Sequence, residues 1–401
     1  MLKNDLQHTT IKDIGAGLKK ELASIAKQKV PAFAQYEADL EGIKESVKTC
    51  CNARNIIVVG RGGSITSYKA IYEALGWHQS KHKVFICNTS DPNYLEHLMR
   101  FAPADNSVVV TISKSGTNVE QLENTLFFSR HKYKIAAITG PNGALREIAD
   151  RLKWKTFMHP DIGGRFIGGT EAALLPTALL EIDIDKLHAG FKSMHAKCAP
   201  SVPLEKNPAL QVAAAFYQLE KKGFSEIFFP IYSHELAGIS ELIVQLFHES
   251  VSKEGGGQTM YGAEGPQSQH HTNQRFFGGG KNVVGWFIRP ETFFHDHATY
   301  IPEEIGDIPL RDGTLADLDD IPLSKVMEYE YRGTYEDAIN IGIPVITTSI
   351  TKLDEENVGE LMGFLQYAAV YSGWMRGVNP FDQPQVEASK NISFDLRKKK
   401  A

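Results

Sequence analysis

Short apolar runs alternate with helix-length segments along the first half of the chain. The runs are rich in β-branched residues and bounded by Gly, Ser, Asn or Pro, and they occupy residues 55–60, 83–88, 107–112 and 134–139. Before them, Leu18, Leu22 and Ile25 have helical spacing among lysines and glutamates. Because the predicted strands recur at a regular interval with helices between them, the pattern predicts a parallel sheet covered on both faces.

A second series of the same kind follows residues 201–210, a proline-containing segment typical of a linker. Its expected strands lie at 226–231, 283–288 and 343–350. We therefore predict an α/β fold of two parallel-sheet, helix-covered subdomains with the active site between them, since open sheets bind ligands beyond the carboxyl ends of their strands. The expected divisions are an N-terminal helical segment (1–50), a first subdomain (51–200), a second subdomain (201–375) and a C-terminal segment (376–401).

Composition argues against a nucleic-acid-binding, membrane or exported protein. The 401 residues carry a formal net charge of −5, so no overall positive field attracts nucleic acid or an anionic membrane. No apolar run approaches the roughly 18 residues that cross a bilayer, and the amino terminus is polar where a signal peptide is apolar. We expect a cytoplasmic protein without nucleic-acid or membrane partners. The cysteines form no CxxC pair and indicate neither zinc nor disulfides; they are Cys50, Cys51, Cys87 and Cys198.

The first candidate loop, GRGGS at 60–64, follows a predicted strand and leads into a predicted helix. A dinucleotide fingerprint would need a third glycine where Ile65 stands and an acidic residue where Asn88 stands. What remains is a glycine-rich turn that can bring backbone N–H groups and Ser64 close to a polar or anionic ligand. A tight turn without any ligand is an equally good interpretation.

Three hydroxyl residues, Ser113, Ser115 and Thr117, cluster between a predicted strand and a predicted amphipathic helix. Hydroxyls and N–H groups at the start of a helix attract phosphate, and Gly116 lets the backbone approach the ligand. Capping of the helix by Thr117 or Asn118 is the alternative, although capping explains only one such residue. Because no nucleotide motif accompanies the cluster, the sequence favours a monophosphate on a small molecule.

Two further segments carry residues suited to acid-base chemistry. Arg165 stands in a glycine-bracketed loop, where it could stabilise an oxyanion or pair with a surface carboxylate. Gln245 and Glu249 are four residues apart on a predicted helix and could point at one ligand. A glutamate on a helix face is ordinarily solvated, so the second interpretation stays open.

Two histidine pairs lie in predicted loops. His270 and His271 could include a proton shuttle or be exposed polar residues. His295 and His297 have an alternating spacing that could ligate a metal, but no third ligand stands nearby. We therefore expect no metal site.

Six segments occur in the order in which a known family carries them. They are GRGGS (60–64), TISKSGT (111–117), GGRF (163–166), QLFHES with KEGGG (245–257), GPQSQHH (265–271) and VEASK (386–390). Each is weak alone, but six in order are specific. Through them, from about Asn55 to Lys390, the chain resembles the glucose-6-phosphate isomerase family of the two-subdomain sugar-isomerase (SIS) fold.

The resemblance implies an aldose-ketose isomerase of glycolysis and gluconeogenesis that interconverts D-glucose 6-phosphate and D-fructose 6-phosphate through a cis-enediol, without cofactor or metal. It implies that Glu249 moves the proton between C1 and C2, that Arg165 stabilises the enediolate, and that His270 and Lys390 open the sugar ring. In this family the histidine is expected to reach the site of the other subunit, so we expect a homodimer. The substrate contacts it implies are Gly63, Ser64, Ser113, Lys114, Ser115, Thr117 and Gln245.

The chain departs from the family at Arg61, where a small or aliphatic residue is usual, and at Thr272 and Asn273, where more apolar residues are usual. These departures bear on pocket contacts and sugar preference. Two alternatives stay open: a non-catalytic regulatory protein that binds a sugar phosphate, and an isomerase of a related hexose phosphate. Glu249 and Lys390 favour catalysis, because a protein that only binds needs neither group.

Overall fold

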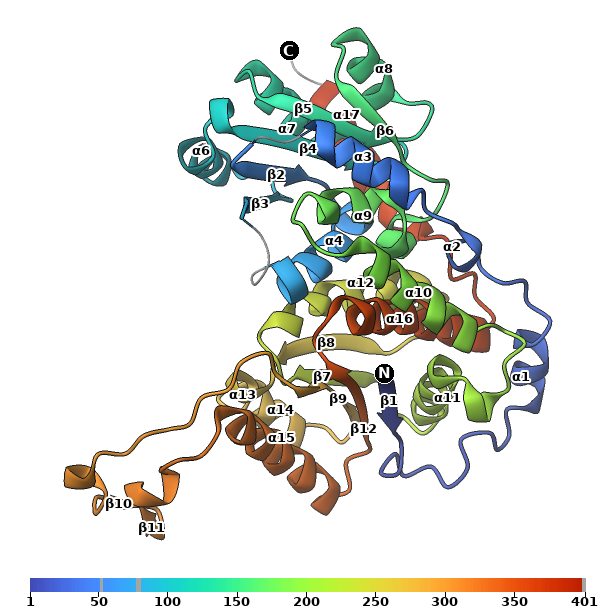
Figure 1. Ribbon diagram of the computed structural model, residues 1–401. Coiled ribbons are helices and arrows are strands. Elements are labelled where there is room, and N and C mark those ends of the chain that lie inside the picture. Colours follow the sequence, from blue (N-terminus) through green and yellow to red (C-terminus); the bar gives the residue numbers. More distant parts are fainter. Residues whose placement is uncertain (51–52, 77–80, 399–401) are drawn as a thin grey trace.

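The first of two large sheets is built from parallel strands only and lies at the top of Figure 1. The computed structural model describes residues 1–50, 53–76 and 81–398. Every residue of the two strands that pair at the middle of this sheet is buried, as their nearly continuous apolar runs predict. The spatial order is β3 (Lys83–Cys87), β2 (Asn55–Val59), β4 (Ser107–Ser113), β5 (Lys134–Thr139) and β6 (Lys155–Met158).

The second sheet lies below the first in Figure 1 and is mixed. Four of its strands are parallel, and a short strand from the amino terminus joins one edge in the antiparallel direction. The spatial order is β1 (Leu2–Asp5), β12 (Val345–Lys352), β9 (Val283–Thr292), β7 (Glu226–Ile231) and β8 (Thr259–Glu264).

All seven strands expected from the sequence form, and the α/β class with helix-covered parallel sheets is confirmed. One expectation needs correction: the first fifty residues do not consist of helices alone, because β1 pairs with the edge strand β12. The sequence of β1, LKND, has no β-branched residue and only one apolar residue. Its strand conformation depends on the open edge of β12, which a local pattern does not reveal.

Helices cover both faces of the first sheet. One face packs against α6 and α7, and the opposite face packs against α3 and α9 within the main core. In chain order, the helices up to residue 178 are α1 (Lys19–Ile25), α2 (Ala32–Gln35), α3 (Leu40–Cys50), α4 (Thr66–Ile71), α6 (Pro92–Phe101), α7 (Val119–Arg130), α8 (Ala144–Arg151) and α9 (Glu171–Ala178). Of these, α1 lies away from the first sheet, where Glu21 pairs with Lys221 (Figure 1).

Helices also cover both faces of the second sheet, and one of them, α16 (Glu355–Met375), is buried along nearly its whole length. Figure 1 shows it between the two sheets beside α10 (Ile184–Lys197). A Cβ added to Gly359 would lie 2.2 Å from the carbonyl oxygen of Leu187, so the two backbones touch at this crossing. The later helices are α11 (Pro208–Lys221), α12 (Ile239–Val251), α13 (Gly265–Ser268), α14 (Thr272–Gly278), α15 (Leu323–Asn340) and α17 (Glu387–Lys398). Of these, α17 lies beside the first sheet, where Arg397 pairs with Glu123 of α7 (Figure 1).

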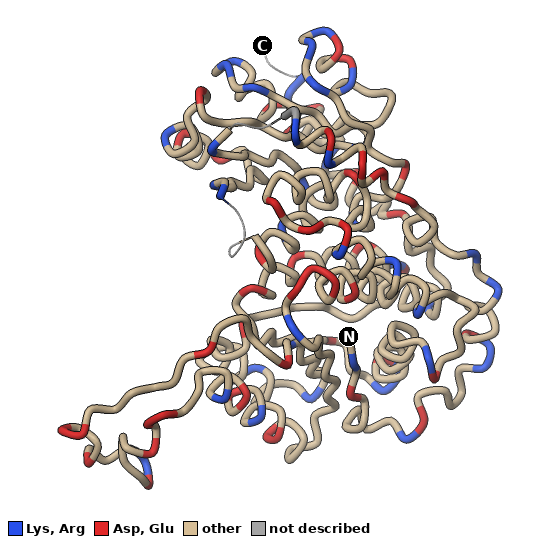
Figure 2. Tube along the Cα trace, viewed as in Figure 1, with Lys and Arg blue, Asp and Glu red and all other residues tan. Residues whose placement is uncertain are grey.

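Residues 293–322 extend away from the body as an arm that ends in the hairpin of β10 (Pro309–Leu310) and β11 (Gly313–Thr314) (Figure 1). Figure 2 shows more acidic than basic residues along it. Exposed apolar side chains on an extended arm are typical of a contact with another chain. The arm exposes Phe294, Tyr300, Ile305, Ile308, Leu310 and Leu318.

The helix crossing generates a prediction about stability. Gly359→Ala should lower the free energy of unfolding by about 3 kcal/mol, because the new methyl group forces α10 and α16 apart in a close-packed core. The matched control is Gly333→Ala on α15, where an added Cβ meets nothing within 4 Å; it should be neutral or stabilise by up to about 1 kcal/mol. Denaturant unfolding of the two variants would contradict this account if both lost the same stability.

Candidate functional site

The glycine-rich turn after β2 forms one wall of the candidate site. Gly62 has a φ of +48°, and with Gly63 and Ser64 it makes the short 3₁₀ turn η1 (Gly62–Ser64) that leads to α4. A Cβ on Gly63 would lie 2.5 Å from the backbone nitrogen of Arg165. Only glycine therefore lets this turn lie directly against the loop that carries Arg165.

Arg165 is the central cation of the site, and its side chain is 2% exposed. It belongs to η4 (Gly164–Gly169), which packs against the glycine-rich turn. Burial lowers the pKa of Arg165 and the charge of Glu249 acts in the opposite direction, so the guanidinium stays protonated. The guanidinium donates to Glu249 Oε2 at 2.9 Å, Ser250 Oγ at 2.9 Å, Gln383 Oε1 at 2.8 Å, Pro380 O at 2.6 Å and Asp382 O at 3.1 Å.

Gln245 and Glu249 share one face of α12, as their spacing predicts. Gln245 Nε2 donates to Glu249 Oε1 at 3.0 Å, so each carboxylate oxygen of Glu249 has its own donor. The side chain of Glu249 is 27% exposed. The interpretation of Glu249 as an ordinary solvated glutamate does not hold, because it faces a buried cation instead.

The hydroxyl cluster lies where β4 ends, next to the glycine-rich turn that follows the neighbouring strand β2. Thr117 Oγ1 donates to Ser115 Oγ at 2.9 Å, and Gly116 has a φ of +62°. The side chain of Asn118 caps α7 by accepting from Gln121 N–H at 3.1 Å. Because Asn118 performs the capping, the exposed Ser115 and Thr117 stay available for a ligand.

Two basic residues of the predicted site are paired with carboxylates other than Glu249. Lys114 lies 2.7 Å from Asp161 and is 42% exposed. Lys390 lies on α17, is 56% exposed and donates to Glu387 at 2.8 Å. Neither residue has a partner among the groups around Glu249 in the part of the chain that the structure describes.

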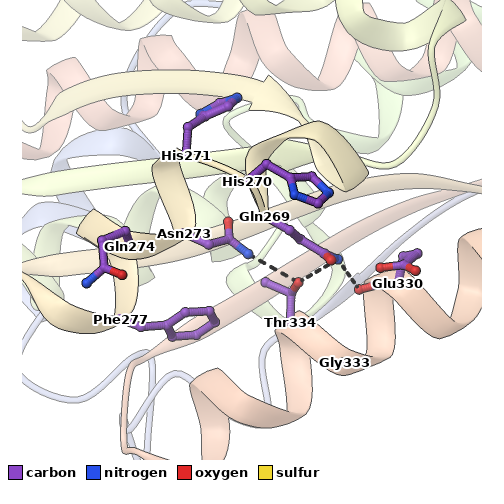
Figure 3. A pocket seen from close by; sticks show the side chains of 9 residues that line it. All are labelled: Gln269, His270, His271, Asn273, Gln274, Phe277, Glu330, Gly333 and Thr334. Carbon is purple, nitrogen blue, oxygen red and sulfur yellow. Dashed lines mark hydrogen bonds between the residues drawn. The ribbon is translucent and has the colours of Figure 1, made fainter. Parts of the chain in front are cut away.

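His270 lies apart from Arg165 and Glu249. It is exposed between α13 and α14 and lines an open pocket of about 460 Å³ that includes neither of those residues (Figure 3). The adjacent His271 is tied to Thr272, whose backbone N–H donates to its Nδ1 at 2.7 Å. The structure therefore brings Gly63, Arg165, Gln245 and Glu249 together but leaves His270 elsewhere on the same chain.

Sequence reasoning missed three polar residues that hold this site. Thr66, at the start of α4, donates to Gln245 Oε1 at 2.6 Å. Gln383 accepts from Arg165, and Lys253 donates to the backbone oxygens of Asn379 and Asp382 and to the Asp382 carboxylate. Thr66 and Gln383 are distant in sequence from the residues they contact, so residue spacing does not predict their roles. Lys253 is the first residue of the KEGGG motif.

Three further findings concern residues 1–50, 53–76 and 81–398. No helix there is long and apolar enough to cross a membrane. No group of three or more His, Cys, Asp or Glu in those ranges could hold a metal ion. Cys87 and Cys198 are free and buried, and burial raises their pKa values to about 11 and about 12. Cys51 lies outside the described residues, and the side chain of Cys50 is not described.

Curated relatives of the chain share one name, and a solved structure shares its fold. No protein-family model matches the chain. A probable glucose-6-phosphate isomerase of Haloarcula marismortui is 31% identical, covering 89% of this chain and 81% of that protein. A glucose-6-phosphate isomerase of Parabacteroides distasonis is 32% identical and covers 90% and 84%. The crystal structure of a glucose-6-phosphate isomerase from Chlamydia trachomatis shares the fold, with a TM-score of 0.74 at 18% identity over 94% of this chain and 78% of that one.

Proposed function

Because the chain belongs to the glucose-6-phosphate isomerase family, we propose that it catalyses the reversible isomerisation of D-glucose 6-phosphate and D-fructose 6-phosphate. The observation that carries the proposal is the pair of a buried Arg165 and Glu249, 2.9 Å apart. A regulator that only binds a sugar phosphate needs no such pair. As part of the same proposal, the reaction serves glycolysis and gluconeogenesis in the cytoplasm, where thiols such as Cys87 and Cys198 stay reduced.

In the proposed reaction, Glu249 takes the proton from C2 of the open-chain aldose and returns it to C1. Two donors hold its carboxylate in one orientation, which suits proton transfer to and from a fixed position. Arg165 stabilises the negative charge that develops on the oxygens at C1 and C2 of the cis-enediol. No step needs a metal or a redox cofactor.

We assign substrate binding to the two loops that follow β2 and β4. Ser113, Ser115 and Thr117, with Lys114 beside them, form the phosphate cradle at the start of α7. Ser115 and Thr117 are exposed and Gly116 has a positive φ, which supports this assignment, whereas Ser113, the last residue of β4, is buried. The remaining sugar contacts are assigned to Gly63, Ser64 and Gln245.

We assign ring opening to His270 and Lys390, with His270 supplied by a second copy of the chain. His270 is exposed and lines a pocket that excludes Glu249, so its own chain does not bring it to the base. The arm at 293–322 exposes the apolar side chains that a second copy would cover. The proposed working unit is a homodimer in which each site takes Glu249 from one subunit and His270 from the other.

The test of the proposed function begins with the unmodified chain. It should convert fructose 6-phosphate to glucose 6-phosphate in a coupled assay with chelator and no added metal. Glu249→Gln should lower kcat by about a thousandfold, because the amide cannot accept the proton, while it still binds a sugar phosphate. Glu241→Gln, an exposed position on the same helix, is the control and should keep full turnover. Substantial activity in Glu249→Gln would show that the base is misassigned.

The phosphate cradle gives a second prediction. Ser115→Ala and Thr117→Ala should each raise KM for fructose 6-phosphate roughly tenfold and change kcat less, since each removes a hydrogen bond to a charged group that persists throughout the reaction. Ser129→Ala, near the far end of α7, serves as the control with unchanged kinetics. A fall in kcat with unchanged KM in the cradle variants would place the phosphate elsewhere.

The shared site gives a third prediction. Glu249→Gln and His270→Ala should each be nearly inactive alone, but unfolding and refolding them as an equal mixture should restore about a quarter of the unmodified activity. Half of the dimers would then be mixed, and each mixed dimer would hold one intact site. A mixture as inactive as its parents, or a chain that sediments as a monomer, would contradict the shared site.

A further inference from the structure

The hydroxyl of Thr66 forms a hydrogen bond to a residue of another helix. It is the first residue of α4, and its residue exposure is 6%. The hydroxyl does not cap its own helix and donates instead to Gln245 Oε1 at 2.6 Å. This short bond crosses from the first half of the chain to the second, because Gln245 belongs to α12.

This bond holds the oxygen of the Gln245 side-chain amide, and the nitrogen of the same amide bonds to Glu249. Gln245 Nε2 donates to Glu249 Oε1 at 3.0 Å. The turn at Gly62 confines the same amide, since a Cβ on Gly62 would lie 3.2 Å from Gln245 Nε2. A glutamine side chain has several rotatable bonds and broad terminal torsions, so it keeps one orientation only when both ends are held.

We propose that Thr66 is a positioning residue for the isomerisation: its hydroxyl fixes the Gln245 amide, and the amide fixes the carboxylate of Glu249. The inference rests on the proposed function, because only in the isomerisation does the Glu249 carboxylate move a proton. Arg165 holds Oε2 of Glu249, and the relay from Thr66 holds Oε1. A carboxylate that accepts a hydrogen bond at each oxygen keeps one orientation, and proton transfer from carbon requires a well-defined distance and angle between base and substrate.

A purely structural role would make Thr66 one of several contacts between α4 and α12. The structure offers a second contact for comparison, because Lys69 of α4 pairs with Glu241 of α12 at 2.8 Å. The side chain of Glu241 is 53% exposed, and its carboxylate bonds to Lys69. Loss of this ion pair loosens the same two helices and leaves the relay intact.

The experiment compares Thr66→Val, Thr66→Ser and Glu241→Gln with the unmodified enzyme. The measurements are kcat, KM and the deuterium isotope effect on kcat with glucose 6-phosphate labelled at C2. Thr66→Val keeps the shape of threonine without its hydroxyl, so kcat should fall about tenfold with KM changed less than about twofold. The isotope effect should rise, because a less well-placed base slows proton transfer relative to the other steps. Thr66→Ser and Glu241→Gln should match the unmodified enzyme.

The isotope effect separates positioning from stability. A variant that is partly unfolded has less active enzyme and a lower apparent kcat, but the isotope effect of its folded fraction does not change. The inference is overturned if Thr66→Val has the kinetics of the unmodified enzyme, or if its loss comes with an unchanged isotope effect. It is also overturned if Glu241→Gln shows the same loss as Thr66→Val. An inactive unmodified chain would refute the proposed function itself, which distinguishes the two failures.

Discussion

The site depends on the burial of one guanidinium. Arg165 has almost no contact with water, and a buried charge is tolerated only when its donors find acceptors. The acceptors come from two separate places, the end of α12 at Glu249 and Ser250 and the loop at 380–383. Without either segment, N–H donors of Arg165 would be buried and unpaired, so Arg165 fixes the end of α12 relative to the loop at 380–383. The geometry of Glu249 follows from that constraint.

The glycines of two motifs make this arrangement possible. Gly63 and Gly164 lie backbone against backbone. A Cβ on Gly63 would lie 2.5 Å from the backbone of the other loop, closer than non-bonded atoms approach, and a Cβ on Gly164 would lie 3.1 Å from the backbone of Gly63, which is an unusually tight contact. The turn after β2 can therefore reach the loop that carries Arg165, and Gly62 leaves room for the amide of Gln245. The GRGGS turn, which the sequence leaves open between a ligand site and a tight turn, does have a packing role beside any contact with substrate.

The sequence predicts those parts of the molecule whose signal is local. Apolar β-branched runs predict seven strands correctly, and the spacing of Gln245 and Glu249 predicts their shared face. It does not predict β1, whose conformation comes from the edge of β12. It also misses Thr66 and Gln383, because each acts on a residue more than a hundred positions away. The roles of the site residues stay predictions, and those of His270 depend on an assembly that no single chain displays.

The charges around Arg165 are balanced in a way that suits the proposed reaction. Lys253 is also buried, but it is bonded to the carboxylate of Asp382 at 2.6 Å, and that bond lowers the pKa of Asp382. Arg165 is the cation that pairs with Glu249. When Glu249 takes the substrate proton it becomes neutral, and the substrate becomes a negatively charged enediolate. The positive charge of Arg165 then stabilises the enediolate in place of the Glu249 carboxylate. The site therefore keeps the same net charge before and after proton transfer, which limits the electrostatic cost of the step in a partly dry environment.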